Sequence, residues 1–241
     1  PDTFWYDKMG EVLMMLAFDP ARSANPSCKL FSNDYMFVKT EKRAGMMTNL
    51  RKLIDAGVPI DGIGMQLHSE VRPVPAELKA AFDDVVSLGK LVHASEIDVL
   101  INNPIYIAEA KVGYDNGPLI AGEYVTMEEL YYGIDGINNV DLEYAQGKSY
   151  NMIVRSFMEN VPDAQKYGLT TWGFTDKTYL YAQNHYGFSD YPMLFGAYYN
   201  KKRAYDGLLE GLNGVDWEYE ESLTWDWRWG NGEYEPKAPW L

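Results

Sequence analysis

Two acidic residues in one short apolar run are the strongest sign of chemistry in this sequence. Glu96 and Asp98 lie two residues apart in the run LVHASEIDV, residues 91–99. The run predicts a buried strand, and side chains two residues apart on a strand point to the same face. Two neighbouring carboxylates disfavour each other's ionisation unless a hydrogen-bond donor lies between them. His68, at the end of the preceding apolar run, is placed to be that donor.

An oriented, ionised carboxylate is the group that a retaining glycosidase uses as its nucleophile. We therefore expect a hydrogen-bonded trio in which His68, together with Asp98, orients Glu96 and helps to keep it an anion. The residues alone leave two alternatives open. Glu96 can be a surface or helix-capping residue beside a core histidine, or the trio can bind a metal ion, although His185 falls on another element.

Alternating helices and short apolar strands must position these residues. The pattern predicts strands at residues 29–35, 62–68, 91–99 and 168–175, and helices at residues 4–23, 40–56, 75–88, 141–161 and 198–212. Such alternation indicates βαβ units and a parallel sheet. A complete (β/α)8 barrel needs about 250 residues, or roughly 31 for each unit. The sequence therefore predicts about four units, half of a barrel.

Two segments depart from this alternation. Residues 100–140 form a long Gly- and Asn-dotted stretch, and residues 214–241 contain a series of tryptophans: Trp217, Trp225, Trp227, Trp229 and Trp240. We expect residues 1–213 to form the half barrel with the stretch at about 100–140 as an inserted loop. The tail, residues 214–241, is expected to pack on the barrel, with a sugar-stacking platform as the alternative.

Functional side chains of such barrels lie at the C-terminal ends of the strands. Each predicted strand here ends in polar or aromatic residues: Asn33-Asp34-Tyr35, Gln66-Leu67-His68, Glu96-Ile97-Asp98 and Trp172-Gly173-Phe174-Thr175-Asp176. A barrel with only a structural role has no need of a Gln, a His, a Glu and a Trp at one rim. The strand ends are therefore the predicted site.

Composition excludes several classes of partner. The 241 residues carry 21 Lys and Arg against 35 Asp and Glu, a net charge of −14 that repels nucleic acids and anionic membrane surfaces. No apolar run approaches the length of a membrane helix, and the N-terminus has no signal-peptide pattern. Cys28 is the single cysteine, which excludes an intrachain disulfide and a cysteine-based metal site. No nucleotide-binding fingerprint is present, so no metal or organic cofactor is expected.

Four motifs resemble those of one enzyme family. Residues 57–68, GVPIDGIGMQLH, resemble the strand-six signature of family 10 glycoside hydrolases, the xylanase family. Residues 30–35, LFSNDY, resemble the strand-five motif, residues 95–98, SEID, the strand-seven nucleophile motif, and residues 172–176, WGFTD, the strand-eight motif. The motifs occur in the family's order and span most of residues 4–212.

The resemblance implies a retaining endo-β-1,4-xylanase that acts on xylan or xylo-oligosaccharides, with a (β/α)8 TIM-barrel fold of which this chain supplies strands 5 to 8 and the Trp-rich tail. Glu96 would be the nucleophile, with His68 and Asp98 as its hydrogen-bonding partners. The implied substrate contacts are Asn33, Tyr35, Gln66, Trp172, Tyr179 and Tyr181. The family also implies a secreted, periplasmic or cell-surface location.

The chain departs from the family in ways that affect function. The family's acid/base Glu follows an Asn on strand four, and this chain has no Asn-Glu dipeptide. We expect that residue on a missing N-terminal half, which would also cover the parallel edge strands that an open half barrel exposes. Alternatives are an acid role for Glu70, Glu123 or Glu128, and a catalytically incomplete carbohydrate-binding fragment.

Two further motifs differ locally from the family. A second Trp usually follows the strand-eight motif, and here residues 178–181 read TYLY, so Tyr179 or Tyr181 can take its place. The family's KPAY motif near the C-terminal end is KRAY here, residues 202–205.

Overall fold

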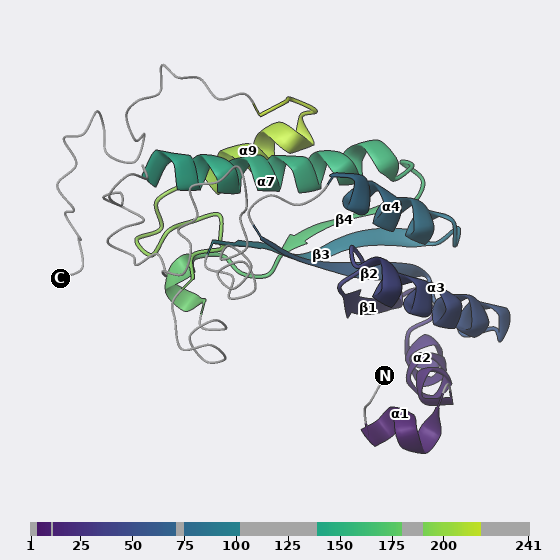
Figure 1. The fold of residues 1–241 in the computed structure, drawn as a ribbon. Coiled ribbons are helices and arrows are strands. Elements are labelled where there is room, and N and C mark those ends of the chain that lie inside the picture. Colours follow the sequence, from purple (N-terminus) through teal and green to yellow (C-terminus); the bar gives the residue numbers. More distant parts are fainter. Residues whose placement is uncertain (1–3, 11, 71–74, 102–138, 180–189, 218–241) are drawn as a thin grey trace. The chain divides into compact units, whose positions relative to one another are not determined.

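The computed structural model describes residues 4–10, 12–70, 75–101, 139–179 and 190–217 (Figure 1). Its elements, in chain order, are α1 (Phe4–Met9), α2 (Val12–Ala24), β1 (Phe31–Tyr35), α3 (Thr40–Asp55), β2 (Gly62–Glu70), α4 (Pro75–Val86), β3 (Leu91–Leu100), α7 (Asn139–Asn160), β4 (Lys166–Thr171), the short 3-10 helix η2 (Asp176–Thr178) and α9 (Arg203–Leu212). Tyr181, most of the predicted insertion and residues 218–241 of the predicted tail lie outside the described residues.

The described strands form one four-stranded sheet in the order β1-β2-β3-β4. β1 pairs with β2 in parallel, from Phe31 opposite Gly62 to Tyr35 opposite Gln66. Glycines on β2 make room for the side chains of β1. A Cβ atom on Gly62 would lie 2.1 Å from Cε1 of Phe31, and one on Gly64 would lie 2.4 Å from Oδ1 of Asn33.

The chain divides into two compact units. The first comprises Pro1–Leu67, Ala76–Glu96 and Glu159–Thr170, and the second comprises His68–Pro75, Ile97–Met158 and Thr171–Leu241. β2 and β3 contribute residues to both units. No helix in the described ranges combines the length and the hydropathy that a membrane crossing requires.

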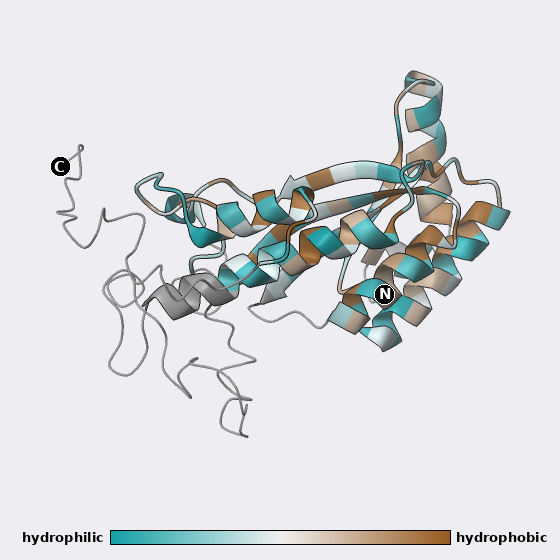
Figure 2. Ribbon diagram, turned by 90° about the horizontal axis from the view of Figure 1, so that it is seen from above, coloured by the Kyte–Doolittle hydropathy of each residue, from teal (hydrophilic) through white to brown (hydrophobic). Residues whose placement is uncertain are grey.

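The core of the first unit lies between its strands and its helices. Buried side chains recur at helical spacing on α3 and α4 and at every second residue of β2: Met47, Leu50, Leu53, Leu78, Ala81, Phe82, Val85, Ile63, Met65 and Leu67. Figure 2 shows the helices with hydrophobic and hydrophilic stripes. Arg43 is also buried, because its guanidinium donates to Asp84 at 2.7 Å and to the carbonyl of Phe37 at 2.8 Å. The helices predicted at residues 40–56 and 75–88 and the strand predicted at residues 62–68 are therefore confirmed, with shifts of one or two residues at their ends.

The core of the second unit is built on α7, whose buried Tyr150, Ile153, Val154 and Phe157 follow helical spacing. α9 lies alongside α7 (Figure 1). The two helices approach closely at glycines, since a Cβ atom on Gly207 would lie 2.0 Å from the carbonyl oxygen of Gly147.

Three predicted elements differ most from the structure. The helix predicted at residues 4–23 is two helices, because Gly10 adopts a positive φ of 57° between them. The strand predicted at residues 168–175 is β4 at Lys166–Thr171, and Thr175 instead caps η2 by accepting from the amide of Lys177. The helix predicted to begin at Tyr198 begins at Arg203, after a turn in which Tyr199 has a φ of 62°.

Replacing Gly207 by Ala is expected to lower the free energy of unfolding by about 1–3 kcal/mol, because the added methyl group must push α9 away from α7. Gly45 is the matched control, since it is exposed on α3 and a Cβ atom there meets nothing within 4 Å. Gly45→Ala should raise the stability by about 1 kcal/mol through its higher helix propensity. Urea unfolding followed by circular dichroism measures both changes. Unchanged stability of Gly207→Ala would contradict the close helix packing.

Candidate active site

Glu96 lies near the end of β3 in the first unit and is half-buried. Its φ of 53° lies in the left-handed region, which costs a residue with a side chain about 1–3 kcal/mol. The burial alternation of β3 also changes here: Val92 and Ala94 are buried, and then Ser95 is buried next to the more accessible Glu96. The simple alternation expected of a strand is therefore interrupted at Glu96.

A hydrogen-bonded chain of side chains holds the Glu96 carboxylate. Nδ2 of Asn33 donates to Oε1 of Glu96 at 2.8 Å. The hydroxyl of Ser95 donates to Oδ1 of Asn33 at 2.6 Å, which fixes the amide so that its NH2 group faces the carboxylate. Asn33, predicted as a substrate contact, is thus found as a donor to the predicted nucleophile. Ser95 was not predicted as a site residue, although it is the first residue of the SEID motif.

Gly64 makes this contact possible. Asn33 is on β1 and Glu96 is on β3, with β2 between them in the sheet. Asn33 stands opposite Gly64 in the β1–β2 register. Since a Cβ atom on Gly64 would lie 2.4 Å from the amide oxygen of Asn33, a side chain at this position would block the path across β2.

Tyr35, at the end of β1, has the exposed ring predicted for a sugar-stacking residue. It is 50% exposed, and Nζ of Lys42 on α3 lies 3.1 Å from its ring centroid. Lys42 also pairs with Oδ1 of Asp34 at 3.3 Å. The ammonium group covers one face of the ring and leaves the other as the accessible apolar surface. Gln66 is the register partner of Tyr35 on β2.

The second unit contains the predicted His68–Asp98 pair. Nδ1 of His68 lies 3.1 Å from Oδ1 of Asp98, whose side chain is 1% exposed. Because an ionised carboxylate only accepts hydrogen bonds, His68 donates to it from Nδ1. This contact is confirmed. The further contact predicted between His68 and Glu96 stays a prediction.

Trp172 also belongs to the second unit. Its amide donates to the carbonyl of Ile97 at 3.1 Å, and its ring meets the His68 ring edge-on with centroids 5.6 Å apart. Trp172 is 49% exposed, and Tyr179, which follows η2, is half-buried. An exposed indole ring therefore lies beside the His68–Asp98 pair.

The metal alternative gains no support from the described side chains. Within those ranges no three His, Cys, Asp or Glu residues are grouped so that they could hold a metal ion. His93 faces Thr170, with Nε2 2.8 Å from the hydroxyl oxygen, and packs against Phe31 and Tyr167. Burial lowers the pKa of His93, so it is a neutral packed histidine at physiological pH.

Comparison with known sequences gives a consistent family. The sequence model of glycosyl hydrolase family 10 matches residues 1–211. Endo-1,4-beta-xylanase A of Cellvibrio japonicus (strain Ueda107) is 30% identical over 203 residues, which cover 82% of this chain and 30% of the relative. Endo-beta-1,4-xylanase Xyn10C of Cellvibrio japonicus is 32% identical over 225 residues, which cover 89% and 33%. The chain thus spans about a third of the length of these two relatives.

Solved structures give the same result. A thermostable mutant of the xylanase Xyn10A from Cellvibrio japonicus superposes with a TM-score of 0.72 at 28% identity, over 88% of this chain and 57% of that one. A mutant of xylanase 10C from Cellvibrio japonicus, in complex with xylopentaose, superposes with a TM-score of 0.69 at 29% identity, over 88% of this chain and 39% of that one.

These comparisons confirm the predicted α/β fold of the (β/α)8 type, of which the described parallel sheet and its helices form a part. The domain boundary predicted between residues 213 and 214 stays a prediction. Four motifs in order, a parallel sheet with polar strand ends and a family match over residues 1–211 lead to one conclusion: the chain belongs to glycosyl hydrolase family 10.

Proposed function

We propose that this chain is part of a retaining glycosidase that cleaves internal β-1,4-xylosidic bonds of xylan, with Glu96 as the nucleophile. The 2.8 Å hydrogen bond from Asn33 to Glu96 carries the proposal. A half-buried carboxylate at a strand end, held by a directed donor and carried on a strained backbone, has the orientation that nucleophilic attack requires. Relatives over most of the chain are endo-1,4-beta-xylanases.

The reaction follows a double displacement. In the first step a carboxylate oxygen of Glu96 forms a bond to the anomeric carbon of a xylose unit while the bond to the leaving oxygen breaks, and an acid group protonates that oxygen. The product is a glycosyl ester of Glu96. In the second step water attacks the same carbon, the acid group now accepts the water proton, and the ester bond breaks to restore Glu96. Two inversions give net retention of configuration.

The acid/base carboxylate belongs, in this proposal, to residues outside this chain. The absence of an Asn-Glu dipeptide supports this, as does the chain's coverage of only 57% of the Xyn10A structure. The two carboxyl groups of a retaining glycosidase lie about 5–5.5 Å apart. The remainder of the barrel is therefore the first proposed partner of the chain.

The second proposed partner is a xylan chain or xylo-oligosaccharide. Tyr35 and Trp172 expose half of their surface at strand ends, and flat rings bind the apolar faces of neutral sugars. The xylopentaose complex of xylanase 10C supports this substrate class. Gln66, Tyr179 and Tyr181 are proposed as further substrate contacts. An extracellular, periplasmic or cell-surface location follows from the size of the polymer.

His68 and Asp98 are proposed to orient Glu96. Asp98 accepts from Nδ1 of His68 and so fixes the orientation of the ring. In this proposal, Nε2 of the ring donates to the Glu96 carboxylate. A donor on the carboxylate holds its oxygens in the orientation that attack on the sugar requires.

Glu96→Gln is expected to lower kcat on an aryl β-xylobioside by at least about 10⁴-fold in the full gene product, because an amide cannot form the glycosyl ester. Glu77→Gln is the matched control, since Glu77 is exposed on α4. Release of the aryl group should show a burst in the unsubstituted protein. Activity of Glu96→Gln near that of the control would remove Glu96 from the mechanism.

Asn33→Ala tests whether Asn33 serves the nucleophile or the sugar. A hydrogen bond to a charged group contributes about 1.5–3 kcal/mol, so its loss should lower kcat by about 10- to 150-fold. KM should change less than about threefold, because the substitution affects the chemical step at Glu96 and not the binding of substrate. Ser95→Ala, which removes the hydroxyl that fixes the amide, should act in the same direction but more weakly. A rise in KM with unchanged kcat would instead make Asn33 a substrate contact.

A further inference from the structure

A fully buried ion pair lies in the second unit, just after β4. Nζ of Lys202 is 2.9 Å from Oδ2 of Asp176, and both side chains are 0% exposed. Asp176 begins η2, between Trp172 and Tyr179 in the chain, and Lys202 immediately precedes α9. With no exposed surface, neither side chain can touch a substrate. Any effect of the pair on substrate binding is therefore exerted through the segments that it joins.

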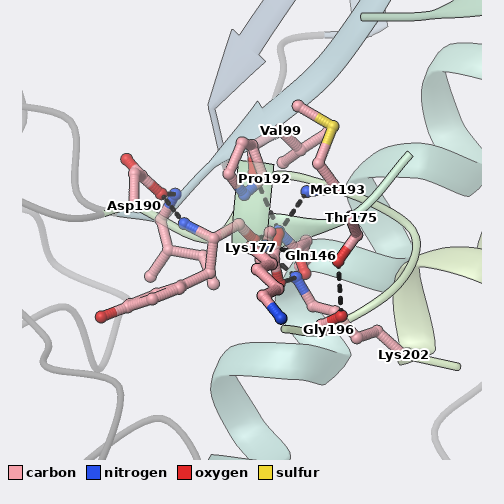
Figure 3. Close-up of polar contacts among 12 residues, drawn as sticks. Val99, Gln146, Thr175, Lys177, Asp190, Pro192, Met193, Gly196 and Lys202 are labelled. Carbon is pink, nitrogen blue, oxygen red and sulfur yellow. Dashed lines mark hydrogen bonds and ion pairs between the residues drawn. The ribbon is translucent and has the colours of Figure 1, made fainter. Parts of the chain in front are cut away.

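The pair is part of a network that ties two chain segments together (Figure 3). Oδ1 of Asp176 accepts from the amide of Met193 at 2.8 Å, and Nζ of Lys202 donates to the carbonyl of Tyr191 at 2.5 Å. Beside the pair, the hydroxyl of Thr175 donates to the carbonyl of Gly196 at 2.7 Å. Residues 175–178 are thus fixed to residues 190–202.

The same segment is fixed to the end of β3. The amides of Ile101 and Tyr191 both donate to Oδ1 of Asp190, at 2.9 and 2.7 Å. Nε2 of Gln146 on α7 donates to the carbonyls of Val99 and Tyr191, at 2.9 and 2.7 Å. Val99 follows Asp98, the acceptor of His68. The network therefore connects the loop that contains Trp172 and Tyr179 to the strand end that holds the His68–Asp98 pair.

The charges around the network are predominantly negative. Asp98, Asp176 and Asp190 are all buried residues. Burial, and then the charges of Asp98 and Asp176, raise the pKa of the nearby Tyr150 well above its ordinary value. Lys202 supplies a fully buried positive charge to this group. A buried ion pair seldom stabilises a fold more than an apolar pair would, but its geometry is specific.

We propose that Lys202 and Asp176 are positioning residues that fix the segment from Trp172 to Tyr179 and so hold the Trp172 ring in its edge contact with His68. The inference rests on the proposed function, in which Trp172 and Tyr179 bind the sugar. Because the pair supports the substrate platform and not Glu96, its loss affects binding of xylo-oligosaccharide more than the chemical step.

The test measures xylopentaose binding by calorimetry, together with KM and kcat, in the full gene product. Lys202→Met is expected to weaken binding by about 10- to 100-fold while kcat changes less than about threefold. Lys79→Met is the matched control, because Lys79 forms an exposed pair with Asp83 at 2.6 Å. The control should bind xylopentaose as the unsubstituted protein does.

A double variant separates positioning from stability. Lys202→Met leaves the Asp176 carboxylate buried without its counter-ion and lowers the melting temperature, whereas Asp176→Asn with Lys202→Met removes both charges and keeps an oxygen for the amide of Met193. The double variant should recover the melting temperature but still bind xylopentaose at least about fivefold more weakly. If Lys202→Met does not fold, xylopentaose binding by the double variant is the deciding measurement.

Two results would overturn the inference. One is a folded Lys202→Met or double variant that binds xylopentaose as tightly as the unsubstituted protein. The other is recovery of binding together with stability in the double variant, which is the pattern of a purely structural pair. If the unsubstituted protein itself does not bind xylopentaose, the proposed function fails, and that outcome is distinct from both.

Discussion

The site depends on one side-chain amide that reaches a carboxylate two strands away, across a position of the middle strand that has no side chain. Asn33 on β1 donates to Glu96 on β3 over Gly64, and Ser95 holds the amide in the required orientation. The sheet order β1-β2-β3 makes Gly64 the residue that must be small. The sheet therefore does more than carry Glu96. The missing side chain at Gly64 on β2 leaves the space through which Asn33 reaches the carboxylate.

Much of the fold follows from local patterns. The apolar spacing of α3, α4 and β2 matched the buried positions, since a residue on one side of a helix or strand meets the core at a fixed period. The failures lie where a backbone departs from a regular period. Gly10 splits a helix, Glu96 interrupts the burial alternation of β3, and Tyr199 precedes the delayed start of α9, each with a positive φ. The positive φ of Glu96 and of Tyr199 leaves no signal in a single sequence, because residues of these types rarely adopt it.

The site was predictable to the extent that it depends on strand ends. The His68–Asp98 contact and the exposed Tyr35 and Trp172 followed from the end positions of parallel strands. Ser95, Lys42 and the Lys202–Asp176 pair were missed, because each depends on which residues from distant segments meet. The sequence KRAY gives no sign that its lysine is buried. In the structure the side chain of Lys202 is 0% exposed, because the packing of residues 190–202 encloses it.

The contact between Asn33 and Glu96 joins residues 63 positions apart in the chain. Contacts of such long sequence separation form only after the intervening chain has lost its freedom, here through the assembly of β1, β2 and β3. Glu96 consequently has no amide donor in a nascent or partly folded chain. Its alignment arises together with the three-stranded arrangement, so an unfinished chain carries the carboxylate without the orientation that would make it reactive.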